Sequence, residues 1–342
     1  MSEKISDVML EKVDSCPICD SAGTAEVSGV YDWMFGSCSN EWRYMKCIDC
    51  DSLYLSPRLL DEHISIAYSK YYTHADADTI VANSKKKSLK LKLLNSYIAS
   101  SEKSNFIDAL KRVMLYPIKN FLAAKSRHIS ELTPGSVLDF GCGNGEFMLL
   151  SKSFGWETKG YDLDESAVFS ARKLGLDVSQ GGISDLINEE SDKYDLITLS
   201  HVIEHVYEPH KLIQECYRLL KPGGRLWLET PNSRSLGLTL FGKYWRGLEP
   251  PRHIVLFNFN SMSNILLSSG FSEMEKRKHP FSSTYMSVKS ERNRMLSLSS
   301  GQSVTKMNVV SLARLSVFSF FIEVTQSIFQ DKSEFITVIA VK

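Results

Sequence analysis

The stretch SVLDFGCGNGEFMLL, from Ser136 to Leu150, decides the fold of this chain. It opens with the short apolar run of a buried strand, passes through three glycines, and becomes helical from Glu146 onward. A strand, a glycine-rich turn and a helix, in this order, are the layout of a nucleotide-binding crevice, because the turn lets a ligand approach the helix N-terminus. The stretch therefore predicts an α/β, doubly wound fold.

The spacing of the glycines indicates which kind of nucleotide the crevice takes. The dinucleotide fingerprint G-x-G-x-x-G needs its third glycine where this chain has Glu146, whereas the glycines here are Gly141, Gly143 and Gly145. A pyrophosphate site is therefore disfavoured. The next predicted strand, in ETKGYDLDES, ends at Asp162 about 20 residues after the loop, where a carboxylate can accept both hydroxyls of a ribose.

Two further segments follow in order, YDLITLSHVIEHV (194–206) and LLKPGGRLWLETPN (219–232). Together with Asp139-x-Gly-x-Gly-x-Gly and Asp162, they resemble the class I S-adenosylmethionine-dependent methyltransferases from about residue 130 to the C-terminus. The resemblance implies a Rossmann-like sheet of seven strands. Its last strand, FITVIAVK (335–342), is expected to enter antiparallel between the fifth and sixth strands.

The resemblance also implies the residues that hold the methyl donor. The glycine loop is expected near its methionine part, Asp162 on the ribose, and Gly182 with Ile183 beside the adenine. Many members have an acidic residue at the adenine position, and in this chain Asp185 comes slightly later. The full set expected to bind S-adenosylmethionine is Asp139, Gly141, Cys142, Gly143, Gly145, Asp162, Leu163, Gly182, Ile183, Ser200 and His201.

The sequence HVIEH, from His201 to His205, also matches the inverted zinc-peptidase pattern H-x-x-E-H. That site needs both histidines and the carboxylate on one helix. Here an apolar, β-branched run leads into His201, and Pro209 is placed to start the next helix. We therefore expect the pentapeptide in a loop at the carboxyl end of a parallel strand, where doubly wound folds bind ligands.

Methyl transfer needs alignment, and it needs a base when the nucleophile is a hydroxyl or an acidic carbon. Our catalytic candidates are His201, Glu204 and His253, while His205 is expected to act mainly through stability. His253 lies in residues 231–259, a long aromatic and basic segment that is expected to close over substrate.

The first 60 residues contain two C-x-x-C pairs, Cys16 with Cys19 and Cys47 with Cys50. Four thiolates complete a closed tetrahedral shell, so the pairs predict a small domain, residues 1–60, with structural zinc. The alternatives are unmetallated turns and a site in which Cys38 replaces one of the four ligands. With this knuckle and PPRHIVLFN (250–258), the chain resembles a narrower group of bacterial methyltransferases of sugar, polysaccharide and secondary-metabolite pathways.

Residues 61–130 are expected to form a helical region that precedes the methyltransferase domain, residues 131–342. The chain has no formal net charge, but residues 85–127 contain eleven Lys or Arg against only Glu102 and Asp108. These lysines form either a solvated helix face or a peripheral contact with an anionic surface, such as lipid, a polyphosphate carrier or nucleic acid.

We predict an enzyme that methylates an oxygen or carbon of a small molecule or glycan precursor. The alternatives are an RNA methyltransferase and a non-catalytic S-adenosylmethionine-binding module. Nucleic acid is disfavoured as a partner because the core lacks basic excess and no NPPY-like tetrapeptide follows the fourth strand. The apolar stretch 307–329 suggests a cover for the core or a homodimer contact. Without a signal-peptide run or an apolar stretch of about 18 residues, cytoplasm is the expected location.

Overall fold

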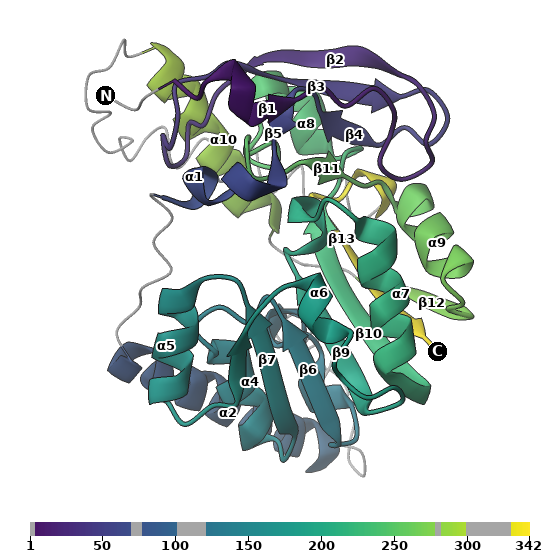
Figure 1. Ribbon diagram of the computed structural model, residues 1–342. Coiled ribbons are helices and arrows are strands. Elements are labelled where there is room, and N and C mark those ends of the chain that lie inside the picture. The colour runs from purple at the N-terminus through teal and green to yellow at the C-terminus, as the bar shows by residue number, and fades with distance from the viewer. Residues whose placement is uncertain (1–3, 70–76, 101–120, 278–281, 299–329) are drawn as a thin grey trace.

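The computed structural model describes residues 4–69, 77–100, 121–277, 282–298 and 330–342 (Figure 1). A large mixed sheet with helices on both faces forms the lower half of the molecule in this view. A smaller unit, built around a second sheet, lies above it. The apolar stretch 307–329 and the helix expected around Pro117 lie outside the described residues.

The large sheet has seven strands in the order β12-β13-β10-β9-β6-β7-β8. The last strand of the chain runs antiparallel between β10 and β12, and the four pairs from β10 to β8 are parallel. The predicted fold class is thereby confirmed. The strands are β6 (Ser136–Phe140), β7 (Glu157–Asp162), β8 (Val178–Gln180), β9 (Tyr194–Ser200), β10 (Leu220–Pro231), β12 (Glu273–Arg277) and β13 (Phe335–Val341).

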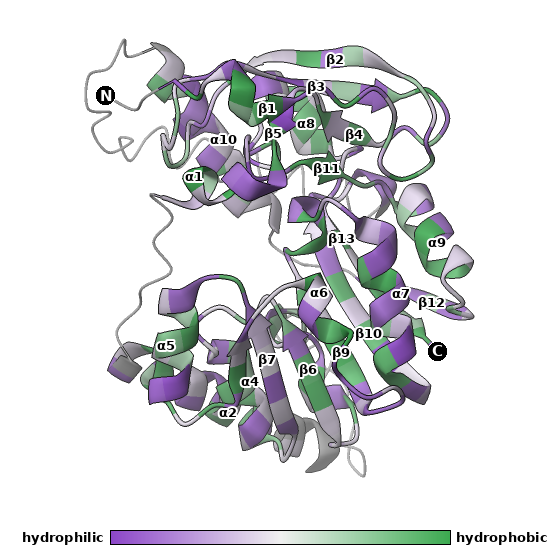
Figure 2. Cartoon of the chain, in the orientation of Figure 1, coloured by the Kyte–Doolittle hydropathy of each residue, from purple (hydrophilic) through white to green (hydrophobic). Residues whose placement is uncertain are grey.

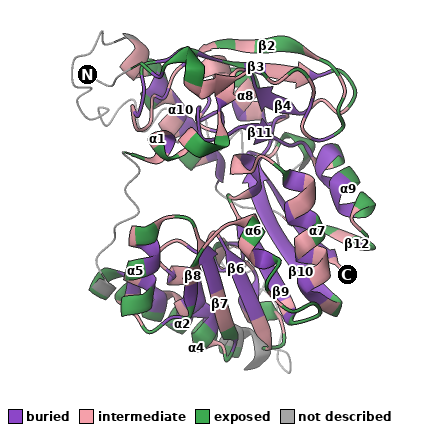
Figure 3. Ribbon diagram, viewed as in Figure 1, coloured by how far each residue is buried: buried purple, intermediate pink, exposed green. Residues whose placement is uncertain are grey.

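The strand order reverses at β6, which has β7 on one side and β9 on the other. This reversal opens a crevice at the carboxyl ends of these strands, where doubly wound folds bind their ligands. Figure 3 shows the central strands buried between helices, and Figure 2 shows hydrophilic residues on the outer helices. The helices of this half are α2 (Ala77–Ser100), α4 (Glu146–Ser153), α5 (Glu165–Lys173), α6 (Ile183–Leu186), α7 (Pro209–Leu219) and α9 (Phe259–Ser268).

Local sequence explains where these helices begin. Pro209 is the first residue of α7, where its missing N–H and fixed φ cost nothing, so the predicted start is correct. Asp164 caps α5 by accepting hydrogen bonds from two backbone N–H groups of its first turn. The long basic helix α2 packs on α4, where Lys92 donates to the carbonyl of Ser153 at 2.6 Å and Leu91 enters the core.

The upper unit is an antiparallel sheet in the order β11-β4-β3-β2, with a separate pair of strands, β1 and β5. The N-terminal 60 residues supply all of these strands except β11, which follows the long segment after β10. The strands are β1 (Leu10–Glu11), β2 (Gly23–Val30), β3 (Trp42–Cys47), β4 (Leu53–Leu55), β5 (Arg58–Leu59) and β11 (Val255–Leu256). The boundaries at residues 60 and 130 stay predictions.

Short helices complete both halves, with α8 (Leu236–Phe241) and α10 (Ser282–Leu298) beside the small sheet in Figure 1. The aromatic residues of the knuckle form its core, because Trp42 and Tyr44 are buried. No helix of the described part is long and apolar enough to cross a membrane. The other helical turns are η1 (Asp7–Met9), η2 (Asp61–His63), α1 (Ser65–Tyr68), η4 (Ile129–Glu131), η5 (Ile203–His205), η6 (Gly242–Tyr244) and η7 (Gln330–Lys332).

Candidate active site

The glycine loop after β6 leaves one face of its backbone open. A Cβ at Gly141 would lie 2.4 Å from Val202 Cγ2, and one at Gly145 would lie 2.3 Å from Leu176 Cδ1, so close packing requires both glycines. Gly143 has a left-handed φ of 53°, and a Cβ there would meet no described heavy atom within 4 Å. A ligand can therefore approach the Gly143 backbone closely.

Asp162, the last residue of β7, is tied to this loop. Its carboxylate accepts the backbone N–H of Gly143 at 2.7 Å and that of Asp164 at 2.9 Å. Burial raises the pKa of Asp162, and the two hydrogen bonds oppose that rise. A carboxylate has about four lone-pair positions, so two remain for the hydroxyls of a ligand.

An apolar wall follows Asp162. The side chain of Leu163 is 71% exposed, and a Cβ at Gly182 would lie 3.4 Å from Leu163 Cδ2. Ile183 begins α6 directly after Gly182. Asp185 accepts the backbone N–H of Gly182 at 2.8 Å, so this carboxylate caps α6. Leu163 and Gly182 thus lie side by side and offer an apolar surface.

Asp139 lies deeper than the loop. Its buried carboxylate is paired with the guanidinium of Arg127 and accepts the hydroxyl of Thr198 at 2.7 Å. The second oxygen, Oδ2, has no hydrogen-bond partner among the described residues. A buried carboxylate oxygen of this kind fits a cationic ligand group, such as the ammonium of a methionine moiety.

Cys142 and Ser200 also belong to the residues expected from sequence to contact the methyl donor. Cys142 is buried against the strand that precedes Asp162, since a Cβ at Gly160 would lie 2.8 Å from its Sγ. Burial raises the pKa of this thiol, which keeps it protonated. Ser200 is the half-buried last residue of β9 and lies in register with Glu229 of β10.

His201 follows β9 and is held between two carboxylates. Its Nδ1 lies 3.2 Å from Glu204 Oε1, and its Nε2 lies 3.7 Å from Glu229 Oε1. Desolvation opposes the charged ring, but the hydrogen bond and charge of Glu204, together with the charge of Glu229, raise the pKa of His201. The side chain is 41% exposed, so a ligand in the crevice can reach it.

Glu204 is fully buried behind His201, and its second oxygen accepts the hydroxyl of Thr230 at 2.9 Å. Burial alone would raise its pKa, but the hydrogen bond from His201 and the charges of three histidines lower the pKa to about 2. Glu204 is therefore ionised and fixes the orientation of the His201 ring.

His205 and His253 lie further from the crevice. Their ring centroids are 4.8 Å apart, and Nδ1 of each contacts a backbone carbonyl, Arg252 O at 2.9 Å for His205 and Gly247 O at 2.8 Å for His253. Burial lowers the pKa of both rings. His253 is thus held in the interior in this structure, whereas the sequence placed it on a closing loop.

Residues 112–275 match the family model described as a methyltransferase domain. This part of the chain is similar to methyltransferase domains. The chain is similar to the ubiquinone biosynthesis O-methyltransferase of Xanthomonas oryzae pv. oryzae, with 39% identity over 111 residues, which are 30% of this chain and 45% of that protein. The protein of the same name from Glaesserella parasuis is 32% identical over 130 residues, which are 34% of this chain and 55% of that protein.

The chain thus spans about half the length of the curated relatives it matches. Among solved structures, it is similar to a SAM-dependent methyltransferase from Archaeoglobus fulgidus, with 21% identity and a TM-score of 0.45. That comparison covers 70% of this chain and 100% of the Archaeoglobus fulgidus chain.

Several residues around the candidate active site are not indicated by the sequence patterns. Glu229, next to His201, stands in the buried strand β10, and a charged residue in an apolar strand was an available signal. Arg127 was counted only as one of many basic residues, yet its guanidinium pairs with buried Asp139 and lies 4.1 Å from the ring centre of Phe147. Tyr68 reaches the site from α1, with its hydroxyl 3.1 Å from His205 Nδ1.

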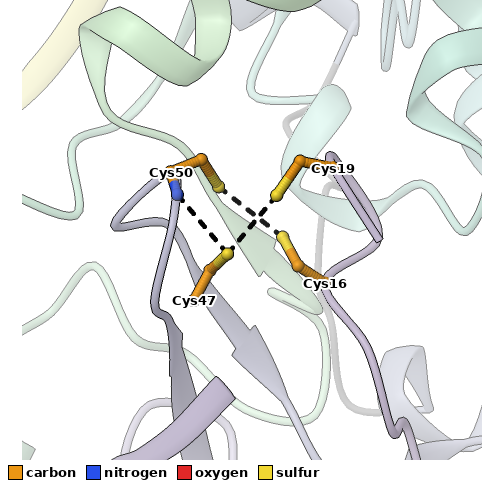
Figure 4. Close-up of side chains that lie close together, drawn as sticks. All are labelled: Cys16, Cys19, Cys47 and Cys50. Carbon is orange, nitrogen blue, oxygen red and sulfur yellow. Dashed lines mark hydrogen bonds between the residues drawn. The ribbon is translucent and has the colours of Figure 1, made fainter. Parts of the chain in front are cut away.

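The four paired cysteines converge in the upper unit (Figure 4). The Sγ atoms of Cys16 and Cys50 are 3.7 Å apart and those of Cys19 and Cys47 are 3.4 Å apart, too far for disulfides. Zinc–sulfur bonds of about 2.3 Å give tetrahedral edges of about 3.8 Å, so the four thiols fit a zinc ion. Cys38 is not in this group and is buried elsewhere.

Proposed function

We propose that the protein is an S-adenosylmethionine-dependent methyltransferase that methylates a hydroxyl oxygen of a small molecule or glycan precursor. The observation that carries this proposal is the meeting of three features at the carboxyl ends of β6, β7 and β9. They are the open backbone at Gly143, the loop-bound carboxylate of Asp162, and the His201–Glu204 pair.

The residues for the donor fit its parts. Asp162 would take the ribose hydroxyls, Leu163 and Ile183 would flank the adenine, and the unpaired oxygen of Asp139 suits the ammonium group. When bound, S-adenosylmethionine supplies an electrophilic methyl group. The oxygen acceptor is favoured over carbon because the similar ubiquinone biosynthesis proteins are named O-methyltransferases.

A neutral hydroxyl is a weak nucleophile, so its proton must leave as the oxygen attacks. His201 would take that proton on Nε2, because Nδ1 is engaged by Glu204, the Nε2 contact with Glu229 is 3.7 Å long, and the ring is partly exposed. Glu204 acts as a positioning residue that fixes the ring and stabilises the imidazolium that forms. This pair argues against a module that only binds the donor.

We further propose that Cys16, Cys19, Cys47 and Cys50 hold a structural zinc ion. In the metal-free cluster, the hydrogen bond between Cys16 and Cys50 lowers the pKa of the Cys50 thiol and raises that of Cys16, and burial raises that of Cys47. Zinc binding would therefore release protons from these thiols. Four sulfur ligands leave no open position, so this ion has no part in methyl transfer.

Calorimetry with S-adenosylmethionine and its demethylated product tests donor binding. Gly143→Val should abolish measurable binding, because the new side chain would fill the open face of the loop. Gly223→Val is the matched control, since Gly223 also has a positive φ, of 76°, and open space at its Cβ but lies in the turn that opens β10. Equal affinity in both variants would contradict the proposed donor site.

Radiolabelled methyl transfer to small-molecule, glycan and lipid extracts tests the reaction. His201→Ala should lower turnover by about 10²–10⁴-fold, the usual contribution of a general base, with donor affinity preserved. His63→Ala is the control, because His63 lies on η2 beside Glu62 at 3.5 Å. If the turnover of His201→Ala stays within a few-fold of wild type, His201 is not the general base.

A further inference from the structure

We propose that Glu204, His205 and His253 form a second metal centre, which takes a divalent transition-metal ion. One ligand atom from each residue lies within 4.8 Å of the other two. The group is separate from the four cysteines in both position and ligand type. Two of its members, Glu204 and His205, lie in the turn η5 after β9, and the third, His253, lies in the segment that precedes β11.

The two imidazoles are already oriented as metal ligands. A carbonyl oxygen can only accept, so the contacts of His205 with Arg252 O and of His253 with Gly247 O place the proton on Nδ1. Nε2 of each ring is then the nitrogen available to a metal. Metal-binding histidines in proteins usually donate their other N–H to a carbonyl or carboxylate in this way.

Glu204 supplies the third ligand. Its oxygens accept hydrogen bonds from His201 and Thr230, and a carboxylate has about four lone-pair positions, so capacity for a metal bond remains. Two imidazoles and one carboxylate suit zinc, iron(II) and related ions rather than magnesium or calcium, which prefer oxygen ligands.

The surrounding charges also favour a cation. The ion pairs that connect to the three ligands in the described residues contain four carboxylates, that of Glu204 included, and two guanidiniums. The negative charges thus exceed the positive ones by two when the histidines are neutral, which one divalent ion would balance. The carboxylates are Asp32, Glu204, Glu229 and Glu249, and the guanidiniums are Arg246 and Arg252, all of them largely buried.

Such an ion would lock the catalytic turn to the segment that carries His253. The backbone already joins them, since the N–H of Ile254 donates to the carbonyl of Glu204 at 2.8 Å. Metal content is measured without any methyl acceptor, so a failure of metal binding and a failure of methyl transfer are distinguishable.

The test is metal content in the full-length chain, stripped with chelator and reloaded with zinc or cobalt(II). We expect two zinc ions per chain in the wild type. His205→Asn and His253→Asn should each retain one zinc ion, because these substitutions remove Nε2. The asparagine amide can still donate to the backbone carbonyl in place of Nδ1–H. His63→Asn should retain both, since His63 lies outside the cluster.

Cobalt(II) spectra assign the remaining ion. The four-thiolate site gives intense sulfur-to-metal charge-transfer absorption, and we expect it unchanged in both asparagine variants, which also shows that the fold is intact. Loss of only the weaker nitrogen- and oxygen-ligand bands would support the proposal. A single zinc ion in the wild type, or a second ion that persists in both asparagine variants, would overturn it.

Discussion

The buried ion pair between Arg252 and Asp32 offers a test of how the N-terminal strands depend on the segment that leads into β11. Both side chains are fully buried, and Arg252 Nη2 lies 2.6 Å from Asp32 Oδ1. The guanidinium also donates to the carbonyl of Ala67 at 2.8 Å and to Glu249 at 2.9 Å. Asp32 belongs to the N-terminal unit, and Arg252 immediately precedes His253.

Asp32→Asn should destabilise the protein by about 1.5–3 kcal/mol, because it removes the charged hydrogen bonds between Asp32 and the buried guanidinium, which keeps only Glu249 as a carboxylate partner. The side chain keeps its size, so packing loss adds little. The double variant Asp32→Asn with Arg252→Met should cost less than the two single variants together, since it leaves neither of these charges unpaired. Urea unfolding of all four proteins, followed by circular dichroism, measures these free energies.

The pH dependence supplies an internal check. Burial opposes the ionised form of Asp32, but the hydrogen bonds and charge of Arg252, with help from Ser37, lower its pKa below the ordinary value. This contribution to stability is therefore complete above about pH 4 and is lost as pH falls through the lowered pKa. Asp32→Asn should be less sensitive to acid over that range. A loss of under about 1 kcal/mol at neutral pH, the size expected of an exposed pair, would refute the argument.

Three further predictions concern single sites. Asp162→Ala should weaken S-adenosylmethionine binding by about 1–3 kcal/mol in calorimetry, through the lost ribose hydrogen bonds, and an unchanged affinity would exclude that contact. Cys47→Ser should lose the structural zinc by elemental analysis, whereas Cys38→Ser keeps it; the reverse result would show a different ligand set. Because α2 exposes Lys86 and Lys90, their replacement by Glu should reduce pelleting with anionic liposomes at low salt, and wild-type protein that never pellets would leave this helix face to solvent.

The arrangement of the large sheet could be predicted because its signals are local. The apolar run of β6, the glycine loop and the carboxylate that ends β7 each occupy one short stretch, and these stretches indicate the α/β, doubly wound class. The number of seven strands is implied by the resemblance to the methyltransferases, and the structure has seven. The apolar run of β13 indicates a strand, whereas its antiparallel entry is implied by the resemblance and is confirmed by its pairing with β10 and β12.

Contacts between distant segments could not be predicted in the same way. The strand β11 has only two residues, too few for any periodic pattern, yet it pairs with β4 of the N-terminal unit. Arg127 looks like its basic neighbours in sequence, and only the fold brings it to Asp139. His253 was assigned to a closing loop because its segment is long and irregular, and burial of its ring depends on partners far away in the chain.

Those partners connect the N-terminal unit to the candidate active site. The hydroxyl of Tyr44 on β3 donates to the backbone carbonyl of His253 at 2.8 Å. The backbone N–H of Leu55 on β4 donates to the carbonyl of Ile254 at 2.9 Å, and Ile254 in turn donates to the carbonyl of Glu204. Because Glu204 orients His201, a continuous chain of hydrogen bonds runs from the cysteine-bearing sheet to the proposed base. The N-terminal unit is therefore part of the framework that holds the turn with the proposed base.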